Sequence, residues 1–302
     1  MKKSIFDSNS EKIIFKRLKT FWSKYVDIFP QIPIRSVIDY ESIKTFSKNP
    51  KTIDFLLKTS FDFVVCELET GIPILIIEFD GLTGGFSQEG KFYNESNLKT
   101  DPYRKLKMET KLKLCRENKI PMIAVSYNES NLLSESGDWI SILDAIIGDS
   151  IEKRYYEKNY NQYMNMLSEA YECGGSESVE MTSIEIDTIN EQYNPIKLKI
   201  NKITDNFPFW PMQIIFPQEN ENWLFGKFTL SHGLQTINNS LHTKKILQID
   251  LKIRKVGVFD SDSIFLFNTI GEYCLARKTE HILGGNFDKW NEAIKSKEWT
   301  KI

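Results

Sequence analysis

Three acidic side chains are spaced so that two neighbouring β-strands would bring them together. Asp62 lies near the start of an apolar segment at 61–68, and Glu78 lies near the end of a second apolar segment at 72–79, with Asp80 just after it. Turn residues between the two segments predict a β-hairpin. If the hairpin turns at residue 70, residues whose numbers sum to 140 lie opposite each other, so Asp62 faces Glu78 and Asp80 shares their face.

A divalent cation would resolve the repulsion among these carboxylates. The other residues of both segments are apolar on either face, which indicates a buried strand pair. Burying an isolated charge costs on the order of several kcal/mol, unless the group becomes neutral by binding or losing a proton. Carboxylate oxygens suit Mg²⁺, which keeps water ligands and binds substrate phosphate. The alternative is purely structural, because acidic residues at strand ends are common and Glu78 could pair with a lysine of a neighbouring helix.

A lysine-rich helix is expected at 102–118, after a Gly- and Ser-rich loop at 81–100. At 100° per residue, Arg104, Lys107 and Lys111 project into the arc between two apolar groups of side chains. Cations in such an arc need partners, so we expect Lys107 or Lys111 to face Glu78 or Asp80. The alternative is that these side chains extend to solvent from a partly exposed helix.

The elements that would position these residues occur in the order helix, strand, strand, strand, helix, strand. The first helix begins among the N-cap residues at 7–10 and ends near Tyr25. The remaining expected elements before residue 128 are a strand near 34–38, a helix around 42–46, the strands 61–68 and 72–79, the helix 102–118 and a strand at 120–126.

The segment 8–128 resembles the PD-(D/E)XK, or restriction-endonuclease-like, nuclease superfamily, in a bacterial branch with Glu-x-Asp-Gly after the third strand. The similarity rests on the order of the elements and on four short motifs. These are Ser10-Glu11-Lys12 at the start of the first helix, Phe61-Asp62-Phe63-Val64, Ile77-Glu78-Phe79-Asp80-Gly81, and Leu112-Lys113-Leu114-Cys115 leading to Ile120-Pro121-Met122-Ile123. The resemblance implies an α/β fold with an αβββαβ core and Mg²⁺- or Mn²⁺-dependent endonuclease cleavage of a phosphodiester, usually in DNA.

The resemblance also implies roles for individual residues. Asp62 and Glu78 match the two acidic metal ligands, and Glu11 matches an auxiliary acidic position. Asp80 stands where many members have the catalytic lysine, and the histidine that often follows Asp-Gly is absent. In such members a lysine of the following helix takes that role, here Lys107 or Lys111. The alternative is an inactive nuclease fold that serves as a nucleic-acid-binding or interaction module.

The rest of the chain is expected to form a connecting region and a second domain. Helices are expected at 139–147 and 151–171, followed by a polar, acidic linker to about residue 194, and residues 149–194 hold 3 Lys and Arg against 10 Asp and Glu. The domains are therefore expected at 1–148, 149–194 and 195–302, the last an α+β accessory domain. Its strands are expected at 196–200, 212–216, 223–230, 246–258 and 263–267, and its helices at 271–282 and 288–296.

Basic residues along the strand at 246–258 offer a second nucleic-acid contact. Lys252 and Arg254 would share a face, with Lys244 nearby, so a stripe that contacts phosphates is one interpretation and a solvated sheet face is the other.

Composition excludes several classes of protein. The 302 residues are 41% hydrophobic and 26% charged with a net charge of −2, typical of a globular protein and not of a polycation. Four widely separated cysteines argue against a disulfide framework or zinc site and favour the cytoplasm. No apolar stretch is long enough for a membrane span or a secretory signal. Nucleic acid is the expected partner, no membrane association is expected, and a homodimer or larger complex is left open.

Overall fold

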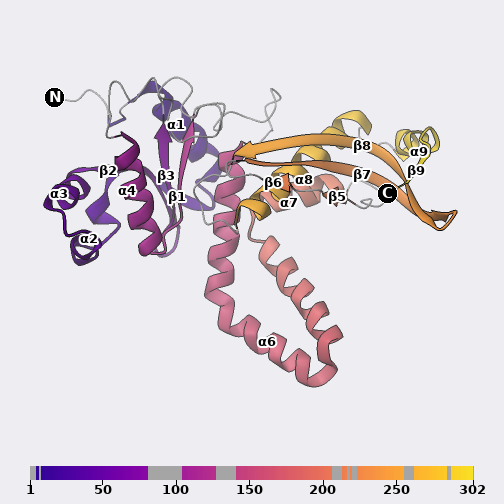
Figure 1. Ribbon diagram of the computed structural model, residues 1–302, viewed down its shortest axis with the longest axis horizontal. Coiled ribbons are helices and arrows are strands. Elements are labelled where there is room, and N and C mark those ends of the chain that lie inside the picture. The colour runs from indigo at the N-terminus through magenta and orange to yellow at the C-terminus, as the bar shows by residue number, and fades with distance from the viewer. Residues whose placement is uncertain are drawn as a thin grey trace. The chain divides into compact units, whose positions relative to one another are not determined.

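The chain has a mixed α/β fold that divides into two compact units (Figure 1). The computed structural model describes residues 5–6, 8–80, 104–126, 141–205, 213–215, 218–219, 223–254, 262–283 and 287–301. One unit comprises Met1–Ser150 with Lys255–Ser263, and the other comprises Ile151–Arg254 with Ile264–Ile302. The described helices contain no stretch that is long and apolar enough to cross a membrane.

A four-stranded mixed sheet forms the centre of the first unit. Its strands are β1 (Val26–Pro33), β2 (Ser60–Glu67), β3 (Pro73–Asp80) and β4 (Met122–Ser126), in the spatial order β1-β2-β3-β4. The first three are antiparallel to their neighbours, whereas β4 runs parallel to β3. A parallel pair needs a crossover connection, and α4 (Arg104–Glu117) lies between β3 and β4 in the chain.

The register of the β2–β3 hairpin agrees with the prediction. Phe63 pairs with Ile77 and Val64 pairs with Ile76, so paired residue numbers sum to 140. These four side chains are buried, which shows that both faces of the hairpin are covered. The register shift at Val65/Cys66 lies near the turn, and the paired ladder ends at Phe63 and Ile77. Asp62 and Glu78 follow just beyond that last pair, where the Asp62 backbone hydrogen-bonds to the Glu78 carboxylate.

The strand that was predicted near 34–38 is wrong, because the first strand, β1, ends at Pro33. The segment Ile34–Ser36 is a 3₁₀ helix, and the strand lies just before it. Pro30 and Pro33 argue against a central strand, but β1 is at an edge of the sheet, where a residue without a backbone N–H donor is tolerated. Val26 and Ile28 are buried while Asp27 is exposed, as expected for one covered face.

Helices and one apolar cluster support this sheet. The helix α1 (Asn9–Trp22) is capped by Ser8, whose side chain accepts from the Glu11 N–H. The helices α2 (Tyr40–Phe46) and α3 (Pro50–Lys58) are inserted between β1 and β2. Together with α4 they enclose a core against one face of the hairpin, made of Ile34, Ile38, Ile43, Leu56, Phe61, Val64, Cys66, Ile76, Leu114, Cys115 and Met122.

The acidic linker that was expected to follow Cys173 is instead helical. The element α6 (Ile142–Glu191) is interrupted at Gly175, where φ is 65° and ψ is −151°. Figure 1 shows that α6 turns back on itself, so this element forms a helical hairpin with two arms. A glycine suits this reversal because a side chain is strained at positive φ. The polar composition of 176–191 reflects helices that are largely exposed.

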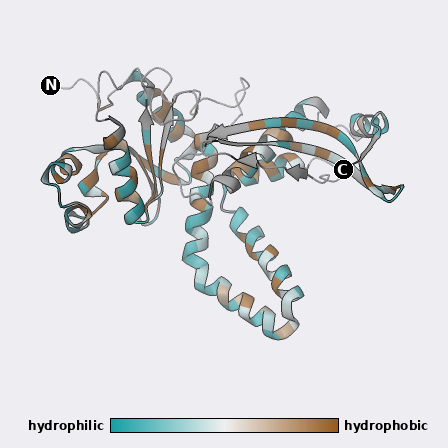
Figure 2. Cartoon of the chain, in the orientation of Figure 1, coloured by the Kyte–Doolittle hydropathy of each residue, from teal (hydrophilic) through white to brown (hydrophobic). Residues whose placement is uncertain are grey.

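The second unit contains a sheet built on a long β-ribbon. The strands β7 (Trp223–Ile237) and β8 (Ser240–Arg254) pair antiparallel around a turn at Asn238 and Asn239, both at positive φ as a type I′ turn requires. Polar and apolar residues mix along the ribbon (Figure 2). The shorter strands β5 (Gln213–Ile215) and β6 (Gln218–Glu219) pair with β7, and β9 (Trp299–Lys301) pairs with β8.

Two segments of this unit that were expected to be strands are helical. Residues 196–200 lie in α7 (Pro195–Thr204), where Asn194 accepts from two backbone N–H groups and Pro195 takes the first turn. Residues 263–267 lie in the helix α8 (Asp262–Leu283). The helix α9 (Phe287–Lys295) follows α8 in the chain. A β-carbon on Gly271 of α8 would lie 2.0 Å from the Phe228 ring, so this glycine permits close packing of α8 on β7.

Candidate functional site

A buried ion pair between Glu78 and Lys111 lies at the centre of the candidate site. The Lys111 Nζ lies 2.8 Å from each carboxylate oxygen of Glu78, and the two residues are only 4% and 7% exposed. The same ammonium donates to the Ser60 backbone carbonyl at 2.8 Å and lies 5.7 Å from the centre of the Phe61 ring. The expected contact between a lysine of this helix and a hairpin carboxylate is therefore confirmed for Lys111.

Lys111 reaches Glu78 because it lies on the inner face of α4. Leu114 and Cys115, three and four residues further on, are both fully buried and share that face. Lys107 is exposed, whereas Lys111 is buried and contacts the Glu78 carboxylate of the hairpin directly.

The carboxyl group of Glu78 is electrostatically strained. Burial raises the pKa of Glu78, and the negative charge of Glu11 raises it further. The Lys111 ammonium and a hydrogen bond from the Asp62 backbone oppose this rise in pKa. Burial, together with the nearby Glu78 charge, also raises the pKa of the Cys115 thiol, so this thiol stays protonated and unreactive.

A glutamine connects two further acidic residues of the site. The Gln31 amide donates to the Asp62 Oδ1 at 3.2 Å and lies 3.3 Å from the Glu11 Oε2. Gln31 lies in β1 with φ at 54°, in the left-handed region that is uncommon for a residue other than glycine. Glu11 is buried at the start of α1, where it also accepts from the Ser8 hydroxyl at 3.0 Å.

The structure thus brings together four of the predicted site residues, from four different elements. Glu11 comes from α1, Asp62 from β2, Glu78 from β3 and Lys111 from α4. Gln31 was missed by the sequence analysis, and the signal for it is weak: a polar residue beside a proline, and one of two polar residues in the strand.

The other predicted site residues either have side chains outside the described residues or lie on β8 of the second unit. Asp80 is the last residue of β3 and pairs with Ser126, but its side chain is outside the described residues, as are those of Lys252 and Arg254 on β8. Lys244 lies on β8 opposite His232 and pairs with Trp299 of β9.

The donor atoms at the site fit a hard divalent cation in type. Glu11, Asp62 and Glu78 supply carboxylates, and Lys111 offsets one of their three charges. Among the described side chains, no group of three His, Cys, Asp or Glu residues is arranged to hold a metal ion. A metal would therefore need a ligand beyond these side chains, and Asp80 is the candidate in the sequence.

Comparison with known proteins bears on the first unit. Residues 2–140 match a family described as "Protein of unknown function (DUF2726)". This segment, slightly less than half of the chain, includes Glu11, Asp62, Glu78 and Lys111. No curated protein and no solved structure matches the chain.

Proposed function

We propose that the first unit is a metal-dependent nuclease of the PD-(D/E)XK type that cleaves phosphodiester bonds in DNA. The observation that carries this proposal is the buried contact of Lys111 with Glu78, close to Asp62 and Glu11. A lysine and three acidic residues from separate elements are costly to assemble unless they serve a site. The order α1, β1, β2, β3, α4, β4, with β4 parallel to β3, supports the same assignment.

Each residue has a role in this proposal. Asp62 and Glu78, completed by Asp80, would hold Mg²⁺ or Mn²⁺. The bound ion supplies an activated water and neutralises phosphate charge. Lys111 would fix the Glu78 carboxylate through both oxygens and provide positive charge beside the phosphate in the transition state. Gln31 would orient Asp62 through its amide. Lys244, Lys252 and Arg254 would contact DNA phosphates.

A second function is favoured by one specific observation. Lys111 already occupies both oxygens of Glu78. If Glu78 cannot bind a metal ion while Lys111 holds both of its oxygens, the fold would serve as a nucleic-acid-binding module without catalysis. Calorimetric titration with Mn²⁺ separates the two functions, because the nuclease binds the ion, whereas the module binds DNA with a steep salt dependence and does not bind the ion.

The nuclease is tested by cleavage of supercoiled plasmid and single-stranded DNA with Mg²⁺ or Mn²⁺. We expect Asp62→Asn and Glu78→Gln each to reduce the cleavage rate about 10²- to 10³-fold, because each removes an anionic ligand of the metal ion that activates water and neutralises the phosphate charge. EDTA is expected to abolish cleavage.

The matched control is Glu117→Gln, at an exposed position of α4. This variant should cleave at the wild-type rate. Circular dichroism should show that all three variants are folded. Wild-type cleavage rates in both Asp62→Asn and Glu78→Gln would contradict the proposal.

A further inference from the structure

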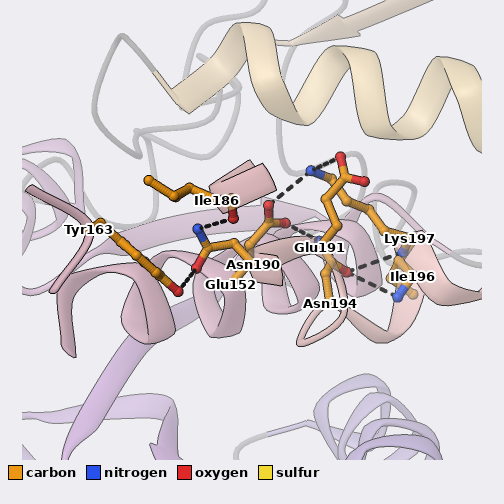
Figure 3. Close-up of polar contacts among 8 residues, drawn as sticks. All are labelled: Glu152, Tyr163, Ile186, Asn190, Glu191, Asn194, Ile196 and Lys197. Carbon is orange, nitrogen blue, oxygen red and sulfur yellow. Dashed lines mark hydrogen bonds and ion pairs between the residues drawn. The ribbon is translucent and has the colours of Figure 1, made fainter. Parts of the chain in front are cut away.

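The helical hairpin of α6 has a firmly held base. The Tyr163 hydroxyl of one arm donates to the Asn190 Oδ1 of the other at 3.1 Å, and the Asn190 amide donates to the Ile186 carbonyl at 2.8 Å (Figure 3). These three residues are buried. The two arms therefore have a fixed relation near their base.

Lys197 of α7 joins both arms to α7 within the second unit. Its ammonium lies 2.9 Å from Glu152 Oε1 on the first arm and 3.0 Å from Glu191 Oε1 on the second (Figure 3). The Asn194 amide also donates to Glu152 at 2.9 Å. Since these contacts fix the base of both arms to α7, the outer part of the hairpin projects from a fixed base.

Residues 164–187, which run from the base around the turn and back, expose large apolar side chains on both arms. Met164, Tyr171, Met181 and Ile184 are between 39% and 68% exposed. Single exposed apolar residues are ordinary, but four within one short projection indicate a contact surface. We call residues 164–187 the acidic arm.

The charge of the acidic arm restricts what can cover it. It contains no Lys or Arg and six acidic residues: Glu169, Glu172, Glu177, Glu180, Glu185 and Asp187. Like charges disfavour nucleic acid and anionic lipid as occupants. A partner must combine positive charge with apolar side chains.

The exposed face of α1 has this combination. Residues 12–25 contain five Lys and Arg and no Asp or Glu. Lys12, Lys16 and Lys19 follow helical spacing along one exposed side of α1, and the neighbouring Ile13 is 52% exposed. Arg17 is instead directed inward to Asp144.

We propose that the acidic arm of one copy of the chain docks on the exposed lysine face of α1 of a second copy. Exposed Tyr171 and Met181 would pack near Ile13, and the arm carboxylates would face Lys12, Lys16 and Lys19. Each copy offers one surface of each kind, so the contact joins two different patches and either closes into a symmetric assembly or continues as a chain.

The test is sedimentation velocity of the full chain from about 1 to about 100 µM, at low and high salt. The wild type should associate more as concentration rises and dissociate as salt rises. Glu177→Lys/Glu180→Lys should weaken association by about tenfold or more, and so should Lys12→Glu/Lys16→Glu. All four positions are exposed, and circular dichroism checks that the variants fold.

The mixture of the two charge-reversed variants identifies the partner surface. Each variant alone should associate weakly, whereas the mixture should regain association because one reversed surface then meets the other. The control Glu41→Lys/Glu292→Lys, at exposed positions elsewhere, should behave as the wild type. A wild type that stays monomeric throughout, or a mixture that regains nothing, would overturn the proposal, and the second result would point to another basic protein as the partner of the arm.

Discussion

Replacing Lys111 with methionine is expected to lower the free energy of unfolding by about 3–5 kcal/mol. The methionine side chain fills a similar volume but leaves the Glu78 carboxylate buried beside Glu11 with no positive charge at 2.8 Å. The Ser60 carbonyl also loses its hydrogen bond from the ammonium. Urea unfolding followed by circular dichroism measures the change.

Two further variants test whether the loss of stability comes from the buried Lys111–Glu78 pair or would follow the removal of any lysine of this helix. Lys113→Met removes an exposed lysine of the same helix and should change stability by no more than about 0.5 kcal/mol. The double variant Lys111→Met/Glu78→Leu removes both charges and should recover most of the loss, because an apolar pair has no desolvation cost. A loss below about 1 kcal/mol for Lys111→Met alone would contradict the buried pair.

Replacing Asp144 with alanine is expected to have a similarly large effect, about 3–5 kcal/mol. This buried carboxylate at the start of α6 accepts from Arg17 at 3.1 Å and from the Trp22 indole at 2.9 Å. It also accepts from the Ser141 N–H at 2.7 Å and the Ser141 hydroxyl at 2.8 Å. Its removal leaves a guanidinium and an indole N–H without this acceptor, and it also removes a helix cap.

Thermal and urea unfolding of Asp144→Ala should be compared with those of Asp54→Ala. Asp54 forms an exposed pair with Lys58, so its loss should cost at most about 0.5 kcal/mol. Asp144→Asn keeps the shape but loses the charge, and it should fall between the two. Equal stability of Asp144→Ala and Asp54→Ala would show that the Asp144 contacts contribute little.

The sequence predicted the central part of the candidate site because local patterns determine it. The alternation of the hairpin and its short turn set the register of Phe63 against Ile77, which leaves the Asp62 backbone within hydrogen-bond reach of the Glu78 carboxylate. The position of Lys111 followed from its place between apolar positions of α4, where a cation needs a partner. Both inferences depend on short-range periodicity, which the tertiary structure did not override.

Other features depend on contacts that a linear pattern does not show. Gln31 lies in an edge strand with an unusual backbone conformation, and its residue type does not predict that conformation. Apolar and polar residues alternate in the segment 196–200 as in a strand. The segment is nevertheless helical, because Asn194 caps a helix there and Pro195 suits its first turn. The second arm of α6 was taken for a linker because its composition is polar, although a hairpin that packs only at its base tolerates that composition.

The most direct measurement of the central claim is an anomalous difference map from crystals of the full chain soaked in Mn²⁺. The account predicts a peak between Asp62 and Glu78, with Asp80 as a further ligand and the Lys111 ammonium still beside Glu78. The peak should be absent in Asp62→Asn crystals grown under the same conditions. A map with no peak in the wild type, with Lys111 still bound to both Glu78 oxygens, would contradict the account.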